Sequence, residues 1–83
     1  MKLNKDKFLK TEFGANLVEC VTAWEKNLKE KDHRAALWCQ AQWEVYQMAL
    51  KQFYGADYHF NRTDHYFGVC TPDGEDWLFK QGR

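Results

Sequence analysis

The segment from Asp32 to Tyr54 constrains the fold more than any other part of this 83-residue chain. At about 100° per residue, its apolar side chains form two stripes, where an ordinary surface helix has one. The first stripe contains Trp38, Ala41, Val45, Met48 and Ala49, and the second contains Cys39, Trp43, Tyr46, Leu50, Phe53 and Tyr54. Because the stripes cover more than half of the helix circumference, the sequence predicts that two different partners pack on this helix.

A first amphipathic helix is predicted ahead of this segment. Apolar residues recur at three- and four-residue spacing from Leu9 to Leu28, and Asn4 is placed to cap the helix. Gly14 interrupts the pattern, which leaves open whether the helix kinks or breaks there. The charged run from Lys29 to Asp32 predicts a turn, with Asp32 placed to cap the next helix, although one continuous helix of about fifty residues is the competing interpretation.

Folding the chain back about Lys31 predicts that the first stripe packs against the first helix. This pairing sets large residues opposite small ones, as close helix packing requires. The predicted neighbours are Trp24 with Trp38, Val21 with Ala41, Leu17 with Val45, and Phe13 and Gly14 with Met48 and Ala49.

After Gly55, which is placed to end the helix in a left-handed conformation, the hydrophobic pattern alternates and predicts three strands. A two-residue turn at Thr63 and Asp64 and a turn over residues 72–74, with Gly74 in a left-handed bulge position, set the register. Under this register Phe60 pairs with Phe67, Tyr58 with Val69, Val69 with Trp77, and Phe67 with Phe79. All six of these residues then share one face, which is predicted to cover the second stripe.

The predicted fold is therefore a single α+β domain over residues 1–83. It has two layers, an antiparallel helical hairpin over about 4–54 and a three-stranded antiparallel β-meander over about 57–81, in the order α-α-β-β-β. A chain of this length buries only about 60% of its unfolded surface. Aromatic residues make up 17% of the sequence, which supplies the bulk for a dense core.

The other face of the predicted sheet is the candidate interaction face. It mixes polar and apolar side chains, and nothing else in so short a chain is left to cover it. Its members are His59, Asn61, Tyr66, Cys70, Leu78 and Lys80, with Gly68 between them. The alternative interpretation is an ordinary solvated face of an antiparallel sheet.

A polar cluster at the tip of the first hairpin is a second candidate. Arg62 beside Asp64 and His65 could hold an anion or pair with a partner carboxylate. Turn formation by Asp64 and packing of Arg62 over a helix end or over the aromatic face are the structural alternative, which the sequence favours.

Residues for catalysis or metal binding are sparse. The chain has no serine, and Cys20 and Cys39 fall on core stripes, which leaves Cys70 and His59 as a weak candidate dyad. Zinc sites use three or four ligands at characteristic spacings, and a Cys–His pair does not meet that requirement. We therefore predict no catalytic residue, no metal, no cofactor and no enzymatic activity.

Twelve basic and twelve acidic residues balance, so bulk charge does not indicate a nucleic-acid partner. Basic residues do gather in two places, the N-terminus and the helical turn, and they support nucleic-acid binding as an alternative. They are Lys2, Lys5, Lys7, Lys10, Lys26, Lys29, Lys31 and Arg34. No apolar run reaches the ~18 residues of a membrane span, and the three cysteines form no Cys-x-x-Cys pair. A cytoplasmic protein with reduced thiols and no membrane partner is expected.

The sequence thus predicts a small non-enzymatic protein-interaction or accessory module. Its partner is an unidentified protein or a second copy of the chain, bound through the outer sheet face, a sheet edge or leftover helix surface. The alternative is a nucleic-acid-binding accessory or regulatory protein, for example of a bacterial mobile element.

Overall fold

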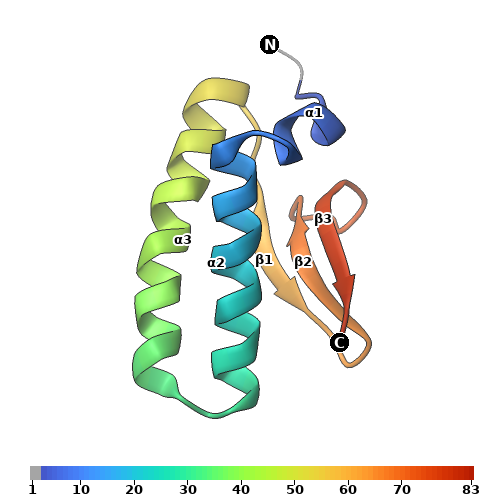
Figure 1. The fold of residues 1–83 in the computed structure, drawn as a ribbon. Helices are drawn as coiled ribbons and strands as arrows, with labels where there is room; N and C mark the ends of the chain where they lie inside the picture. Colours follow the sequence, from blue (N-terminus) through green and yellow to red (C-terminus); the bar gives the residue numbers. More distant parts are fainter. Residues whose placement is uncertain (1–2) are drawn as a thin grey trace.

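The computed structural model describes residues 3–83 and shows a pair of long antiparallel helices packed on one side of a small sheet (Figure 1). Three helices, α1 (Lys5–Leu9), α2 (Glu12–Lys29) and α3 (His33–Tyr54), precede three strands, β1 (His59–Arg62), β2 (Tyr66–Cys70) and β3 (Trp77–Gly82). The strands form one antiparallel sheet in the order β1-β2-β3. This arrangement confirms the predicted α+β fold.

Three predicted helix-end residues are confirmed. The side chain of Asn4 accepts a hydrogen bond from the Lys7 amide at 3.1 Å, and Asp32 accepts one from the Ala35 amide at 3.1 Å. These bonds satisfy amide groups that have no partner within a helix. Gly55 ends α3 with a φ of 67°, in the left-handed region that glycine adopts without strain.

The question left open at Gly14 is resolved as a break, which lies before the glycine. Helix α1 ends at Leu9, and Thr11 caps α2 by accepting a hydrogen bond from the Gly14 amide at 3.0 Å. A Cβ atom at Gly14 would lie 2.1 Å from the carbonyl oxygen of Phe8. Glycine is therefore required because α1 folds back directly onto the first turn of α2.

The predicted contact between α2 and the first stripe of α3 is wrong. Helix α2 meets the second stripe instead, where the Cys20 thiol donates to the Cys39 carbonyl oxygen at 3.4 Å. The rings of Phe13 and Tyr46 also pack edge to face at 5.2 Å. The second stripe spans about 100°, wide enough for α2 and the sheet to pack on it from two sides.

The predicted register between β1 and β2 is wrong by two residues. Phe60 pairs with Val69, because the loop tip is formed by Asp64 and His65 and the Thr63 amide donates to the Tyr66 carbonyl oxygen at 2.7 Å. The Thr63 hydroxyl accepts hydrogen bonds from the two amides that follow Asp64, which favours this loop. Since side chains alternate with a period of two, the shift leaves the inner face unchanged.

Between β2 and β3 the predicted register is also wrong, and here the faces change. Val69 pairs with Phe79 and Cys70 with Trp77, which leaves Leu78 as an extra residue in a β-bulge. The bulge turns Leu78 into the core, where it is 3% exposed, and places Trp77 on the outer face beside Tyr66. The left-handed conformation predicted for Gly74 is confirmed by its φ of 75°.

The core lies between the helical pair and the inner face of the sheet. Its fully buried members come from α2, α3 and β2, and aromatic side chains close its ends, with the Trp24 ring stacked on Phe60 at 4.1 Å. The buried cluster contains Phe8, Leu17, Cys20, Val21, Trp43, Leu50, Tyr58, Phe67, Val69 and Leu78. None of the residues 37, 38, 41, 45 and 48 of α3 belongs to this cluster.

Candidate interaction surface

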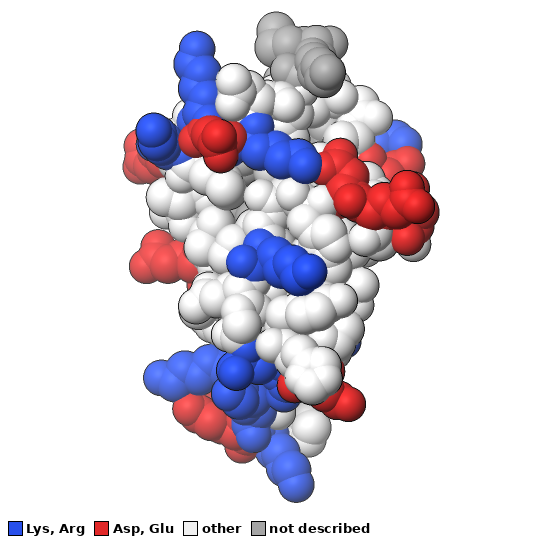
Figure 2. Space-filling view, turned by 90° about the vertical axis from the view of Figure 1, so that its right-hand side faces the viewer, with Lys and Arg blue, Asp and Glu red and all other residues white. Residues whose placement is uncertain are grey.

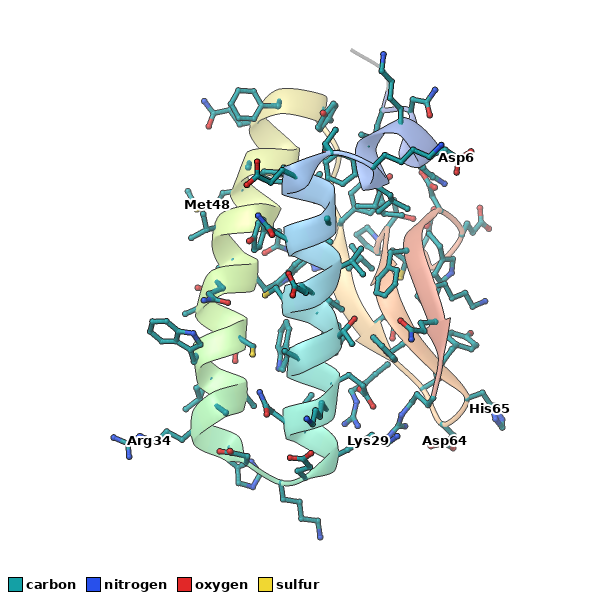
Figure 3. All side chains as sticks on the ribbon, viewed as in Figure 1. Asp6, Lys29, Arg34, Met48, Asp64 and His65 are labelled. Carbon is teal, nitrogen blue, oxygen red and sulfur yellow. The ribbon has the colours of Figure 1, made fainter. Side chains whose placement is uncertain are left out.

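One side of α3 is turned away from the sheet (Figure 1). It carries large apolar side chains that the described residues leave mostly exposed. The exposed fractions are 65% for Leu37, 68% for Trp38, 67% for Val45 and 70% for Met48. Figure 3 shows Met48 and Arg34 projecting outward from this side of the helix. The opposite side of the same helix is buried through Ala36, Trp43 and Leu50.

The exposed residues follow a strict spacing of four, three, four, three and four residues. We call them the α3 seam, which consists of Arg34, Trp38, Ala41, Val45, Met48 and Gln52, flanked by Leu37. This is the spacing of the two core positions of a heptad repeat, by which one helix packs along another. The seam extends about 27 Å along the helix axis, with its polar members at the two ends.

An apolar hollow of ≈ 280 Å³ adjoins one end of the seam. It is bordered by Phe8, Thr11, Phe13, Ala49, Phe53 and Tyr54, from helices α1, α2 and α3. Phe53 is itself 68% exposed, and Ala49 flanks both Met48 of the seam and the hollow. The apolar surface therefore widens at this end of α3.

The outer sheet face, predicted as the interaction face, is less open than expected. The rings of Tyr66 and Trp77 pack edge to face at 5.3 Å, and the Lys80 ammonium lies 4.0 Å from the centre of the Tyr66 ring. Cation–π contact and ring packing thus hold these three side chains against one another. Figure 2 shows this side of the molecule with a mostly uncharged middle.

The other predicted members of that face separate into buried and exposed groups. Leu78 belongs to the core because of the bulge, so its predicted place on the outer face is wrong. Cys70 is 2% exposed, and the Asn61 side-chain amide lies 3.5 Å from its sulfur. His59 is exposed at the edge, with its Nδ1 atom 3.4 Å from the Gln47 amide nitrogen on α3.

The predicted polar cluster at the hairpin tip does not come together. Asp64 and His65 lie exposed at the end of the loop, as Figure 3 shows. Arg62 instead donates two hydrogen bonds to the Glu25 carboxylate of α2, at 2.7 and 3.3 Å. Arg83 lies 2.7 Å from the same carboxylate, which therefore sits between two guanidinium groups.

The sequence analysis missed Glu25 as the partner of Arg62 and Arg83 as a second cation on the same carboxylate. The Glu25 side chain is only 4% exposed, and it ties α2 to the hairpin tip and the last described residue. A signal for this role was present, because Glu25 follows Val21 by four residues on the apolar face of its helix. A carboxylate on such a face needs a cationic partner.

The basic residues considered for nucleic-acid binding do not form one surface. Lys5 pairs with Asp76, and acidic residues accompany the basic ones at both ends of the face in Figure 2. At the turn between α2 and α3, Glu30 and Asp32 alternate with Lys29 and Lys31 ahead of Arg34. Lys2 lies outside the described residues.

The thiols are enclosed within the fold. Burial raises the pKa of Cys20 to about 11, and the neighbouring Cys39 adds to this shift, so the neutral thiol is strongly favoured. Among residues 3–83, no group of three or more His, Cys, Asp or Glu side chains is arranged to hold a metal ion. Cys70 and His59 pair across the β1–β2 ladder, but the cysteine is buried.

No family model, curated protein or solved structure matches this chain. Within the described part of the chain, none of the helices has the length and apolar character needed to cross a membrane.

Proposed function

We propose that this chain is a non-enzymatic protein-interaction module that binds a partner helix along the α3 seam. The observation that carries this proposal is the exposure of about two thirds of Leu37, Trp38, Val45 and Met48 on a helix whose other side is buried. A helix that is apolar on two opposite sides needs cover on both. Residues 3–83 supply cover on one side only.

The energetics support a binding role for this surface. Burying the exposed part of each of these four side chains would contribute about 1–2 kcal/mol. Leaving them in water gives the isolated domain no comparable gain, and contiguous apolar surface of this kind is characteristic of interaction sites.

The shape of the seam favours a helical partner. The heptad spacing makes a straight, narrow ridge, and an amphipathic helix presents a matching apolar stripe. The small Ala41 at its middle allows the two backbones to approach closely. The outer sheet face is a weaker candidate, because Tyr66, Trp77 and Lys80 already pack on one another.

The proposal is tested by replacing Val45 with a photo-crosslinking amino acid in cells that naturally make the protein. A partner on the seam should be captured from position 45, since this side chain lies in the middle of the seam. The matched control is the same replacement at Thr22, an exposed position on α2 away from the seam. Equal capture from both positions, or none from position 45, would contradict a binding role for the seam.

A further inference from the structure

Resting on the proposed function, we propose that the partner helix is α3 of a second copy of this chain, running antiparallel to the first. The seam would then form a two-fold interface in which the same surface is used on both copies. The order of side chains along the seam and the area that the seam exposes both favour this partner.

Side-chain sizes along the seam match in the antiparallel direction. With the two-fold axis at the height of Trp43, Trp38 of one copy lies over Met48 of the other. Ala41 lies over Val45 in the same arrangement. Each layer therefore combines a larger and a smaller side chain, which is how helix seams fill space evenly.

The hollow beside Ala49 adds to this match. Trp38 has the largest side chain of the seam, and antiparallel packing brings it to the end where the ≈ 280 Å³ hollow lies. Phe13 and Phe53 border this hollow and are themselves partly or largely exposed, so they would form its walls around the incoming indole. The bulky half of the seam on one copy thus meets the open half on the other.

A parallel pairing matches poorly. It would stack Trp38 on Trp38 and Ala41 on Ala41, which crowds one layer and leaves space in the next. It would also place the two Arg34 guanidinium groups together at one end. The antiparallel pairing instead sets Arg34 against Gln52, whose side-chain carbonyl accepts hydrogen bonds.

The exposed surface is sufficient for a reversible dimer. The large apolar side chains of the seam, together with Leu37 and Phe53, expose roughly 600 Å² per copy. If about two thirds of this area is covered, the apolar fraction usual for interfaces gives about 1,300 Å² of total buried surface. That lies at the lower end of standard interfaces, so we expect a dissociation constant in the micromolar range.

One group opposes the pairing. Glu44 flanks the seam near the two-fold axis, so the carboxylates of the two copies approach each other. We therefore expect Glu44→Gln to tighten the dimer about two-fold at low ionic strength. In a parallel pairing Glu44 would face Ala49, and this substitution would have no such effect.

The first experiment is sedimentation equilibrium of the full chain from micromolar to millimolar concentration. The wild type should change from monomer to dimer, and Val45→Glu should weaken the dimer by at least about ten-fold because it buries a carboxylate at the centre of the seam. Thr22→Glu adds the same charge on α2 and should leave the dimer unchanged. Circular dichroism confirms that both variants are folded.

The second experiment measures the direction of the two helices with a spin label on Arg34→Cys, using unsubstituted protein to correct for labelling of the buried native cysteines. In the antiparallel dimer the two labelled positions lie about 27 Å apart along the axis. A parallel dimer would bring them to within about 10 Å across the interface. The short separation would overturn the proposed arrangement.

The outcomes separate this inference from the proposed function. A wild type that remains monomeric at all concentrations overturns the dimer. If position 45 then crosslinks to a different protein and position 22 does not, the binding role of the seam is retained with another helix as occupant. If position 45 captures nothing, both proposals are wrong.

Discussion

Trp38 and Trp43 lie five residues apart on the same helix, yet one is 68% exposed and the other is 4% exposed. Five residues turn the helix by about 140°, so these two indoles face nearly opposite directions. Trp43 lies in the core between α2 and the sheet, while Trp38 lies in the seam. The comparison shows that apolar character alone does not decide burial in α3. A side chain of this helix is buried only where α2 and the sheet pack on it.

The largest effect is expected for Trp43→Ala, which should lower the free energy of unfolding by about 3–5 kcal/mol. The reason is that removal of a buried indole leaves a cavity that the surrounding core fills only partly. Chemical denaturation at low protein concentration, where the chain is monomeric, measures the effect.

The matched control is Trp38→Ala. Because the Trp38 side chain contacts mainly solvent, its loss should change the stability of the monomer by no more than about 0.5 kcal/mol. A loss as large as that of Trp43→Ala would show that the indole of Trp38 is buried in the monomer and that the seam is not a free surface.

The same contrast can be drawn between two ion pairs. Arg62 pairs with a Glu25 side chain that is 4% exposed, whereas Lys51 and Asp57 pair with about 60% of both side chains exposed. We expect Arg62→Gln to destabilise the fold by about 2–3 kcal/mol, since it leaves the buried carboxylate with Arg83 alone. Denaturation at neutral pH measures this loss.

Asp57→Asn serves as the exposed counterpart and should change stability by about 0–1 kcal/mol, because water screens this pair. If Arg62→Gln cost no more than Asp57→Asn, the Glu25 carboxylate would have to be reached by water in solution. The proposed role of this carboxylate in joining α2 to the hairpin would then be wrong.

Much of the fold could be predicted because it depends on patterns that tolerate local error. The helix ends were predicted from Asn4, Asp32 and Gly55. The side chains of Asn4 and Asp32 accept hydrogen bonds from free amides at a helix start, and Gly55 ends a helix in the left-handed conformation. The face of β1 and β2 was correct although the register was wrong, because a shift of two residues restores the same face.

The errors arose where the sequence pattern is compatible with more than one strand register. Trp77, Leu78 and Phe79 form an uninterrupted apolar run, so alternation could not show that a bulge turns Trp77 outward. No Asn-Gly or Asp-Gly pair marks the tip of the first hairpin, which left its turn ambiguous by one residue.

The candidate surface was missed for a related reason. Both stripes of α3 are rich in aromatic and aliphatic residues, and the fold-back about Lys31 provided a plausible cover for the first stripe. The regular spacing of Ala36, Trp43 and Leu50, opposite the seam, marks the side that enters the core. Composition could not show which side of α3 is buried. The choice depends on how α2 and the sheet pack against the helix.

The dependence of stability on alkaline pH tests the contact between Cys20 of α2 and the buried side of α3. The Cys20 thiol donates a hydrogen bond to the Cys39 carbonyl oxygen. Its pKa is raised from an ordinary 9.0 to about 11, mainly by burial and to a smaller extent by the nearby Cys39 thiol. Between these values the unfolded chain loses this proton and the folded chain keeps it. Stability is therefore fully present below pH 9 and falls by up to about 1.4 kcal/mol per pH unit as the pH rises towards 11.

This dependence is measured by urea denaturation at a series of pH values, with Cys20→Ala as the control. The variant lacks the titrating thiol, so its stability should fall less steeply between pH 9 and 11, even if it is less stable at neutral pH. Burial also raises the pKa of Tyr46 and Tyr58, which adds a fall of the same sign at higher pH in both proteins. Equal slopes for the wild type and the variant over this range would mean that water reaches the Cys20 thiol. In that case α2 and α3 would pack less tightly in solution than in the structure. The buried and exposed sides of α3 would then differ less in solvent exposure than the structure indicates.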